Sequence, residues 1–187
     1  MAVLGTLKWA IILCRFRGVP GTPVTKDFCR KFFITPGTGG LYDYWKDLSY
    51  EKFSLDGSVV LGPCTLSYTL DEAKDSAREQ HIASHTNPDK RTHSRVFRVQ
   101  DAVKDLASQI DYSDIDGVIT IFNAPFDVGA TWIALPLAGG NTRGVPAVCL
   151  EPPSFEPHML GHLSEHETGH MLGLSHIERG VKDCDHP

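Results

Sequence analysis

Apolar positions along the chain fall into short continuous runs, typical of buried strands, and into stripes spaced as on a helix. Residues 7–16 (LKWAIILCRF) form an apolar run with β-branched and aromatic residues and predict a central strand. Residues 116–122 (DGVITIF) and 147–150 (AVCL) predict two more buried strands. The stretch 52–70 predicts either a hairpin or two separate strands. Together these segments indicate a sheet with a hydrophobic centre.

Helices are predicted where apolar residues recur at intervals of three and four. The first such stripe carries Phe28, Phe32 and Phe33, and Thr25 is a candidate N-cap. Helices and strands that alternate in this way favour a mixed α/β (α+β) fold, with helices packed on a twisted mixed sheet. The predicted helices cover residues 25–34, 41–48, about 71–81, 99–110 and 155–172.

Residues 123–146 are rich in proline and glycine and lie between two predicted strands. This stretch is too long for a plain connector in a compact domain. We therefore expect a functional loop that borders a substrate cleft.

Length and composition indicate a single globular domain over residues 1–187. Hydrophobic residues make up 41% of the chain, enough to build a core. The formal charge of −5 argues against a nucleic-acid-binding surface. No apolar run approaches the roughly 18 residues of a membrane span, so none is expected.

The five cysteines do not form a CxxC pair, which disfavours a zinc site built from thiolates. Cys14 and Cys149 lie in apolar runs and are expected in the core. Cys29, Cys64 and Cys184 could include one disulfide. The odd number leaves at least one thiol unpaired in a monomer.

The residues that indicate a function lie near the C-terminal end, in the stretch HETGHMLGLSH (166–176). Two histidines four residues apart project from one face of a helix, so His166 and His170 can bind one metal ion. Gly173 allows the chain to leave the helix in a left-handed conformation. The turn then brings His176 to the ion as a third ligand.

Glu167 is placed to act beside this ion as a general base. On a helix of 3.6 residues per turn it lies about 100° round from His166 but about 60° from His170. It therefore borders the metal, where it can hold a water molecule. Three neutral imidazoles leave Zn²⁺ with an open position for water, which is the arrangement of catalytic zinc. Zinc is thus the expected cofactor.

Two more histidines continue the spacing of four, His158 and His162. His162 and His170 are about 12 Å apart along a helix axis, so three members of the ladder cannot share one ion. Only the pair His166 and His170 has an interposed glutamate and a downstream glycine and histidine. We expect the other pair to be exposed side chains, or else an adventitious metal site.

The full string HExxHxxGxxH resembles the metzincin clan of zinc endopeptidases. A second stretch, GGLYDYWKDLSYEKFSLDGSV (39–59), looks like the segment before the catalytic motif in secreted peptidases similar to immune inhibitor A and gametolysin. The resemblance implies a zincin-like catalytic domain with a long active-site helix, a polypeptide substrate and an extracellular location. It makes His166, His170 and His176 the zinc ligands and Glu167 the general base.

The chain departs from this clan at His162, which is unusual there, and in its C-terminal part, because metzincins have a methionine turn downstream of the third histidine. The methionines here are Met1, Met159 and Met171, and all precede His176. The closing residues KDCDHP resemble the lead-in to such a turn. We therefore expect either a C-terminally truncated domain, whose C-terminal subdomain is largely missing, or a site that works without this turn.

Two other interpretations remain open on these residues. The chain could be an inactive pseudo-peptidase that binds zinc or a protein partner without turnover, although the intact Glu167 disfavours this. It could also be a structural zinc domain, which needs a fourth protein ligand. Cys184, eight residues beyond His176, is the candidate for that ligand.

Overall fold

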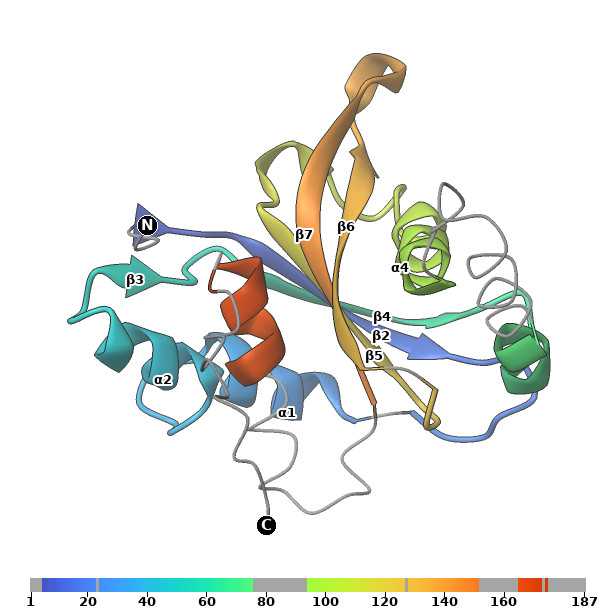
Figure 1. Cartoon of the computed structure of the whole chain (residues 1–187), viewed down its shortest axis with the longest axis horizontal. Helices are drawn as coiled ribbons and strands as arrows, with labels where there is room; N and C mark the ends of the chain where they lie inside the picture. The colour runs from blue at the N-terminus through green and yellow to red at the C-terminus, as the bar shows by residue number, and fades with distance from the viewer. Residues whose placement is uncertain are drawn as a thin grey trace, which may run out of the picture.

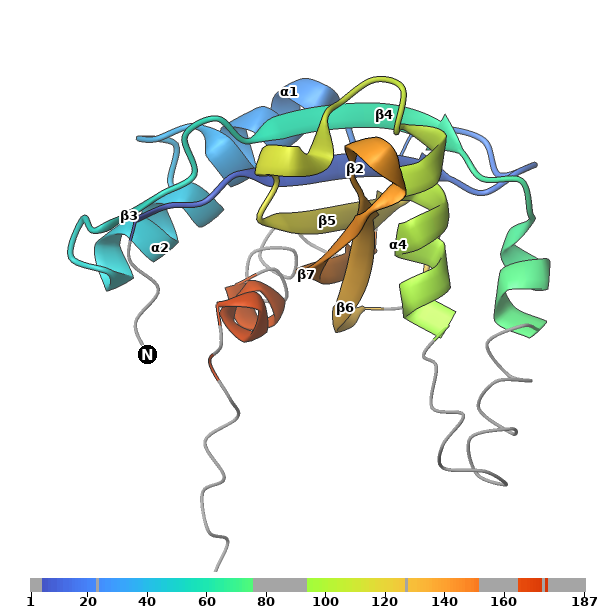
Figure 2. The same cartoon turned by 90° about the horizontal axis from the view of Figure 1, so that it is seen from above.

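The computed structural model of the chain describes residues 5–22, 24–75, 94–126, 128–151, 165–172 and 174. These residues form a mixed α/β fold in which helices cover both faces of a twisted, mostly parallel sheet (Figures 1 and 2). The predicted class of fold is therefore confirmed. None of the described helices is long and apolar enough to cross a membrane.

The main sheet has five strands in the order β4-β2-β5-β7-β6. Four of them run parallel, and β6 pairs antiparallel with β7 at one edge of the described sheet. A smaller parallel pair, β1 with β3, lies apart from it. The strands are β1 (Gly5–Thr6), β2 (Trp9–Arg15), β3 (Phe53–Ser54), β4 (Val59–Thr65), β5 (Gly117–Phe122), β6 (Gly129–Pro136) and β7 (Thr142–Leu150).

The strand predictions hold for the centre of the sheet and need correction at its edge. The runs at 7–16 and 116–122 form β2 and β5, which are buried along almost their whole length. The stretch 52–70 forms two strands and no hairpin, because β3 pairs with β1 while β4 pairs with β2. The stretch 123–146 is not a loop, because it contains β6 and the first residues of β7.

Within the described residues, helices form in all five predicted regions, and only the helix at 41–48 has the predicted ends. Thr25 caps the first helix as predicted, since its hydroxyl accepts a hydrogen bond from the backbone N–H of Phe28. The described helices are α1 (Lys26–Cys29), continued by a π-helix η1 (Arg30–Ile34), α2 (Leu41–Leu48), α4 (Ser94–Asp105), the short 3-10 turns η3 (Tyr112–Asp114) and η4 (Ala138–Gly140), and two helical segments at residues 70–75 and 165–171.

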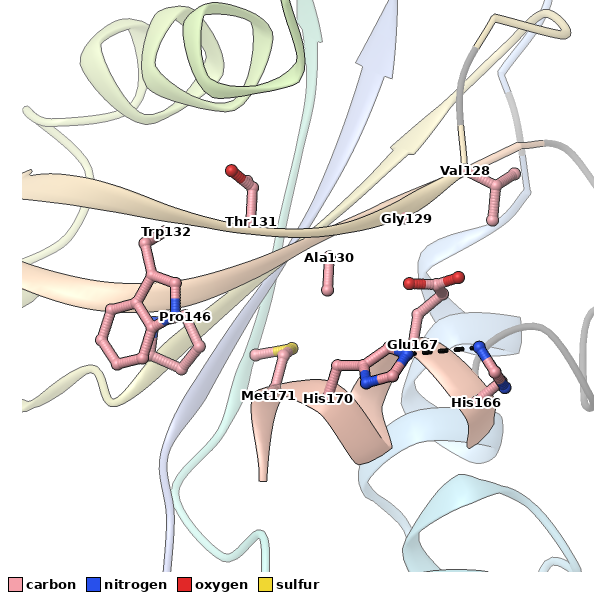
Figure 3. A pocket seen from close by; sticks show the side chains of 10 residues that line it. All are labelled: Val128, Gly129, Ala130, Thr131, Trp132, Pro146, His166, Glu167, His170 and Met171. Carbon is pink, nitrogen blue, oxygen red and sulfur yellow. Dashed lines mark hydrogen bonds between the residues drawn. The ribbon is translucent and has the colours of Figure 1, made fainter. Parts of the chain in front are cut away.

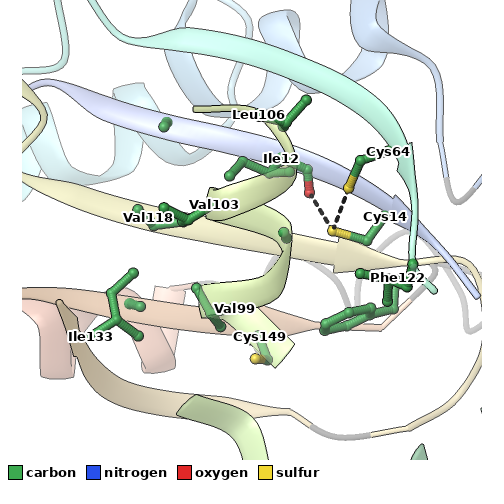
Figure 4. Close-up of a cluster of buried hydrophobic side chains, with 14 of the residues drawn as sticks. Ile12, Cys14, Cys64, Val99, Val103, Leu106, Val118, Phe122, Ile133 and Cys149 are labelled. Atoms are coloured by element: carbon green, nitrogen blue, oxygen red, sulfur yellow. Dashed lines mark hydrogen bonds between the residues drawn. The ribbon is translucent and has the colours of Figure 1, made fainter. Parts of the chain in front are cut away.

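The core lies in two layers, one on each face of the sheet. Alternate residues of β2 supply both layers: Ile12 contributes to the layer beneath α4 (Figure 4), and Ile11 to the opposite layer with α1, η1 and α2. The segment 165–171 packs on this second face through Met171 and Leu172. The sheet therefore separates α4 from the segment that carries the histidines.

In the described part of the chain, four cysteines are buried and none of them is in a disulfide. Cys14 and Cys149 lie in the core beneath α4, as predicted. Cys29 and Cys64 do not form a disulfide, because they belong to opposite faces of the sheet. The Sγ atoms of Cys14 and Cys64 lie 3.7 Å apart, and burial raises the pKa of Cys14 well above its usual range (Figure 4). Cys184 lies outside the described residues.

Candidate functional site

The helical segment 165–171 has one apolar face and one polar face. Thr168, Met171 and Leu172, spaced by three and four residues, are buried against the sheet and α2. His166 and Glu167 lie on the other side, where His166 is exposed and Glu167 half-buried. The sequence folds in this way because the apolar positions of the segment follow helical spacing. His166 and Glu167 are thereby directed away from the core, whereas Thr168 faces it.

A buried hydrogen bond fixes the segment to α2. The indole N–H of Trp45 donates to the hydroxyl of Thr168 at 3.0 Å. Gly169 lies directly against the same indole, because a Cβ at this position would be 3.4 Å from the Trp45 ring. The pKa of Tyr44, the residue before Trp45, is raised mainly by burial and to a smaller extent by the negative charge of Glu165.

A second close contact seats the segment on the sheet. A Cβ at Gly117, the first residue of β5, would lie 2.6 Å from the Cε of Met171 and 3.1 Å from the Trp9 ring. Because glycine has no side chain, position 117 leaves room for Met171. Contacts with α2 and β5 together fix how close the helical segment lies to the sheet and which of its sides faces the sheet.

The two described histidines of the motif face each other through their Nε2 atoms. These atoms are 3.3 Å apart, and the rings are nearly perpendicular, at 89° (Figure 3). The Nδ1 atom of His170 lies 2.8 Å from the carbonyl oxygen of Leu174. Because a carbonyl can only accept, Nδ1 must carry the proton, and in the neutral ring Nε2 keeps its lone pair.

This separation fits two ligands of one tetrahedral zinc ion. Two nitrogens at 2.0–2.1 Å from zinc, on two corners of a tetrahedron, are about 3.3–3.4 Å apart. In zinc sites, the imidazole nitrogen that does not bind the metal usually donates a hydrogen bond, which orients the ring. His166 and His170 therefore fit the metal, with the proton of His170 held on the nitrogen away from it.

The third predicted ligand, His176, lies outside the described residues, as do His158, His162 and Cys184. Within the described ranges, no three His, Cys, Asp or Glu side chains form a group able to hold a metal ion. The structure thus brings together two of the three predicted ligands and the predicted base.

A cavity of about 450 Å³ lies between the segment and the edge strand β6. His166, Glu167 and His170 line it from the helix, and residues 129–132 of β6, with Val128 just before the strand, line it from the other side (Figure 3). Its size is that of an ordinary ligand pocket. The predicted base and both described histidines therefore open onto one cavity, beside the strand formed by the stretch that we expected to border the cleft.

Three parts of this site were not predicted from the sequence. The hydrogen bond between Trp45 and Thr168 joins residues far apart in the chain, although Trp45 lies in a predicted helix. The strand β6 itself could have been suspected from the alternation in GATWIALP, which we assigned to a loop. The contact between Gly117 and Met171 could not be predicted from the sequence, because the two residues are far apart in the chain and no local pattern links them.

Comparison with models of protein families, with curated proteins and with solved structures finds no match to this chain. The functional argument therefore rests on the residues and geometry of the site.

Proposed function

We propose that the chain is a zinc-dependent metalloendopeptidase. In this proposal His166, His170 and His176 bind zinc, and Glu167 is the general base. The observation that carries it is the pair of Nε2 atoms 3.3 Å apart, with the far nitrogen of His170 bonded to the Leu174 carbonyl. Glu167 lines the same cavity as both rings.

The position of β6 supports a polypeptide as the substrate. The strand lies at the edge of the described sheet, and its residues form the wall of the cavity opposite Glu167. An extended peptide can add to the sheet as a further strand alongside such an edge strand, and its side chains then alternate between the two faces of the sheet. We propose that the chain forms a single zincin-like catalytic domain with this cavity as its cleft.

Each residue has a defined part in this reaction. Bound zinc would polarise the scissile carbonyl and lower the pKa of a water molecule to about 7. Glu167 accepts the proton of the attacking water and then donates it to the leaving amine. The Leu174 carbonyl holds His170 in the tautomer in which Nε2 carries a lone pair that can bind the metal. Thr168 and Trp45 hold these side chains at their place on the sheet.

Zinc content after mild dialysis tests the metal centre. We expect one zinc per chain in the wild type and loss of zinc in His170→Ala, because one of three imidazole ligands is removed. His162→Ala is the matched control, four residues before His166, and should keep its zinc. Equal zinc in wild type and His170→Ala would contradict the proposal, since the metal would then bind elsewhere.

Cobalt substitution separates an open, catalytic site from one closed by Cys184. A thiolate ligand gives a charge-transfer band, whereas three imidazoles and water do not. We expect no such band, and the same spectrum in Cys184→Ser. A band that disappears in this variant would favour a structural zinc domain.

A further inference from the structure

The cavity has an aromatic side chain at the end away from Glu167. Side chains of a strand alternate between its two faces, so Ala130 and Trp132 point to the same side of β6. Ala130 packs on the core layer that holds the histidine segment, whereas Ile133 belongs to the layer beneath α4. Trp132 therefore projects on the side of the sheet where the histidines lie, and Figure 3 shows it at the far end of the cavity from Glu167.

Trp132 is unusually accessible for so large an apolar side chain. It is 68% exposed, whereas Trp9 and Trp45 are 1% and 7% exposed. Among the large apolar residues described as exposed, Trp132 is the one that lines this cavity. The others are Phe28, Tyr44, Leu48, Tyr50 and Leu174. Single exposed apolar residues are common on proteins, so its place in the cavity distinguishes Trp132.

The surroundings of the indole are apolar. Pro146 lies directly opposite Trp132 in the antiparallel pairing of β6 and β7, and the two side chains form one wall of the cavity. Met171 lies between this wall and His170 in Figure 3. The described cavity residues include one charged side chain, Glu167, which is at the other end. An aromatic wall without a neighbouring carboxylate favours an uncharged apolar group over a cation.

We propose that Trp132 and Pro146 form a subsite that selects an aromatic or large aliphatic side chain of the peptide substrate. This inference rests on the proposed peptidase function and names the residues that set its specificity. Ala130 and Trp132 are two positions apart, about 6.6–6.8 Å along the strand. Figure 3 shows Ala130 between Trp132 and Glu167, so a peptide bond held opposite Ala130 lies within about two residues of the selected side chain.

Cleavage profiles of a peptide mixture test the selection. Peptides from a denatured protein digest are incubated with zinc-loaded wild type and Trp132→Ala, and the cut sites are read by mass spectrometry. We expect an aromatic or large aliphatic preference at one position near the cut in the wild type. That preference should fall about tenfold in Trp132→Ala, the scale of one apolar pocket contact. Leu48→Ala, which removes another exposed side chain away from the cavity, should keep the wild-type profile.

A binding measurement does not depend on turnover. Iodide quenches exposed tryptophan, and Trp132 is the exposed one of the three. Acetylated pentapeptides that differ only in a central Phe, Ala or Lys are added to zinc-loaded Glu167→Gln, which leaves them uncut. We expect the Phe peptide to protect Trp132 from iodide at a concentration about tenfold lower than the Ala or Lys peptide.

The two measurements separate failure of the subsite from failure of the enzyme. Protection by the Phe peptide without any cleavage would support the subsite and remove the peptidase function. Cleavage with the same profile in Trp132→Ala, or equal protection by all three peptides, would overturn the subsite and leave the peptidase. Stronger protection by the Lys peptide would replace the apolar subsite with a cation site. If the protein shows no cleavage and none of the peptides protects Trp132, both proposals are overturned.

Discussion

Replacement of Thr168 with valine tests how the histidine segment is fixed to the rest of the fold. The change keeps the size and β-branching of the side chain and removes only the hydroxyl. That hydroxyl accepts the indole N–H of Trp45 at 3.0 Å, and Thr168 is fully buried. In Thr168→Val the indole N–H is therefore left in the core without its observed partner.

The cost follows from the burial of this donor. A buried polar group that loses its partner destabilises a protein by about 1–3 kcal/mol. For a chain of this size, each kcal/mol corresponds to about 2–4 °C in Tm. We expect urea denaturation of Thr168→Val to show a fall of that size in the free energy of unfolding, with an unchanged m-value.

A double-mutant cycle isolates the bond from other effects of the change. In Trp45→Phe the donor is absent, so adding Thr168→Val should cost about 1 kcal/mol less than it does in the wild type. A wild-type stability for Thr168→Val, or a coupling energy near zero, would refute the argument that this bond holds the segment.

Two further predictions concern other contacts of the fold. Gly117→Ala should destabilise by about 1–3 kcal/mol in urea unfolding, because its Cβ would overlap Met171, whereas Gly144→Ala, with open space at its Cβ, should stay within about 0.5 kcal/mol. Equal effects of the two would contradict the packing at β5. Hydrogen bonds from backbone N–H groups lower the pKa of Asp43, and the bond from Gly37 is the largest cause. The ionised carboxylate therefore adds to the free energy of unfolding above the ordinary aspartate pKa of about 3.9. This contribution is lost as the pH falls below that value. The urea midpoint of Asp43→Asn should lie below that of wild type at pH 7 and approach it below about pH 4; a constant difference would contradict this linkage.

The sequence predicted the central strands well because they are buried on both faces and read as continuous apolar runs. It predicted the edge strand β6 poorly, because glycines and prolines surround it and one of its large apolar residues, Trp132, faces the cavity. The hairpin considered for 52–70 failed for another reason. Strands near in sequence can each pair with a distant partner, and only the three-dimensional register reveals it.

The described residues of the candidate site could be placed together from the sequence because they lie within little more than one turn of helix. His166, Glu167 and His170 are local, and helical spacing alone places them together. Their support is not local: Trp45 comes from α2 and Gly117 from β5. The predicted role of His176 as the third ligand stays a prediction, since this residue lies outside the described ranges.

Peptide hydrolysis by Glu167→Gln, compared with wild type at equal zinc content, tests the central claim most directly. Glutamine keeps the size of the side chain and removes its ability to accept the proton of water. The account predicts that zinc-loaded wild type cleaves an unfolded protein and that kcat/KM falls at least about a hundredfold in the variant. A zinc-loaded wild type without activity, or a variant within a few-fold of it, would contradict the assignment of Glu167 as the general base of a zinc peptidase.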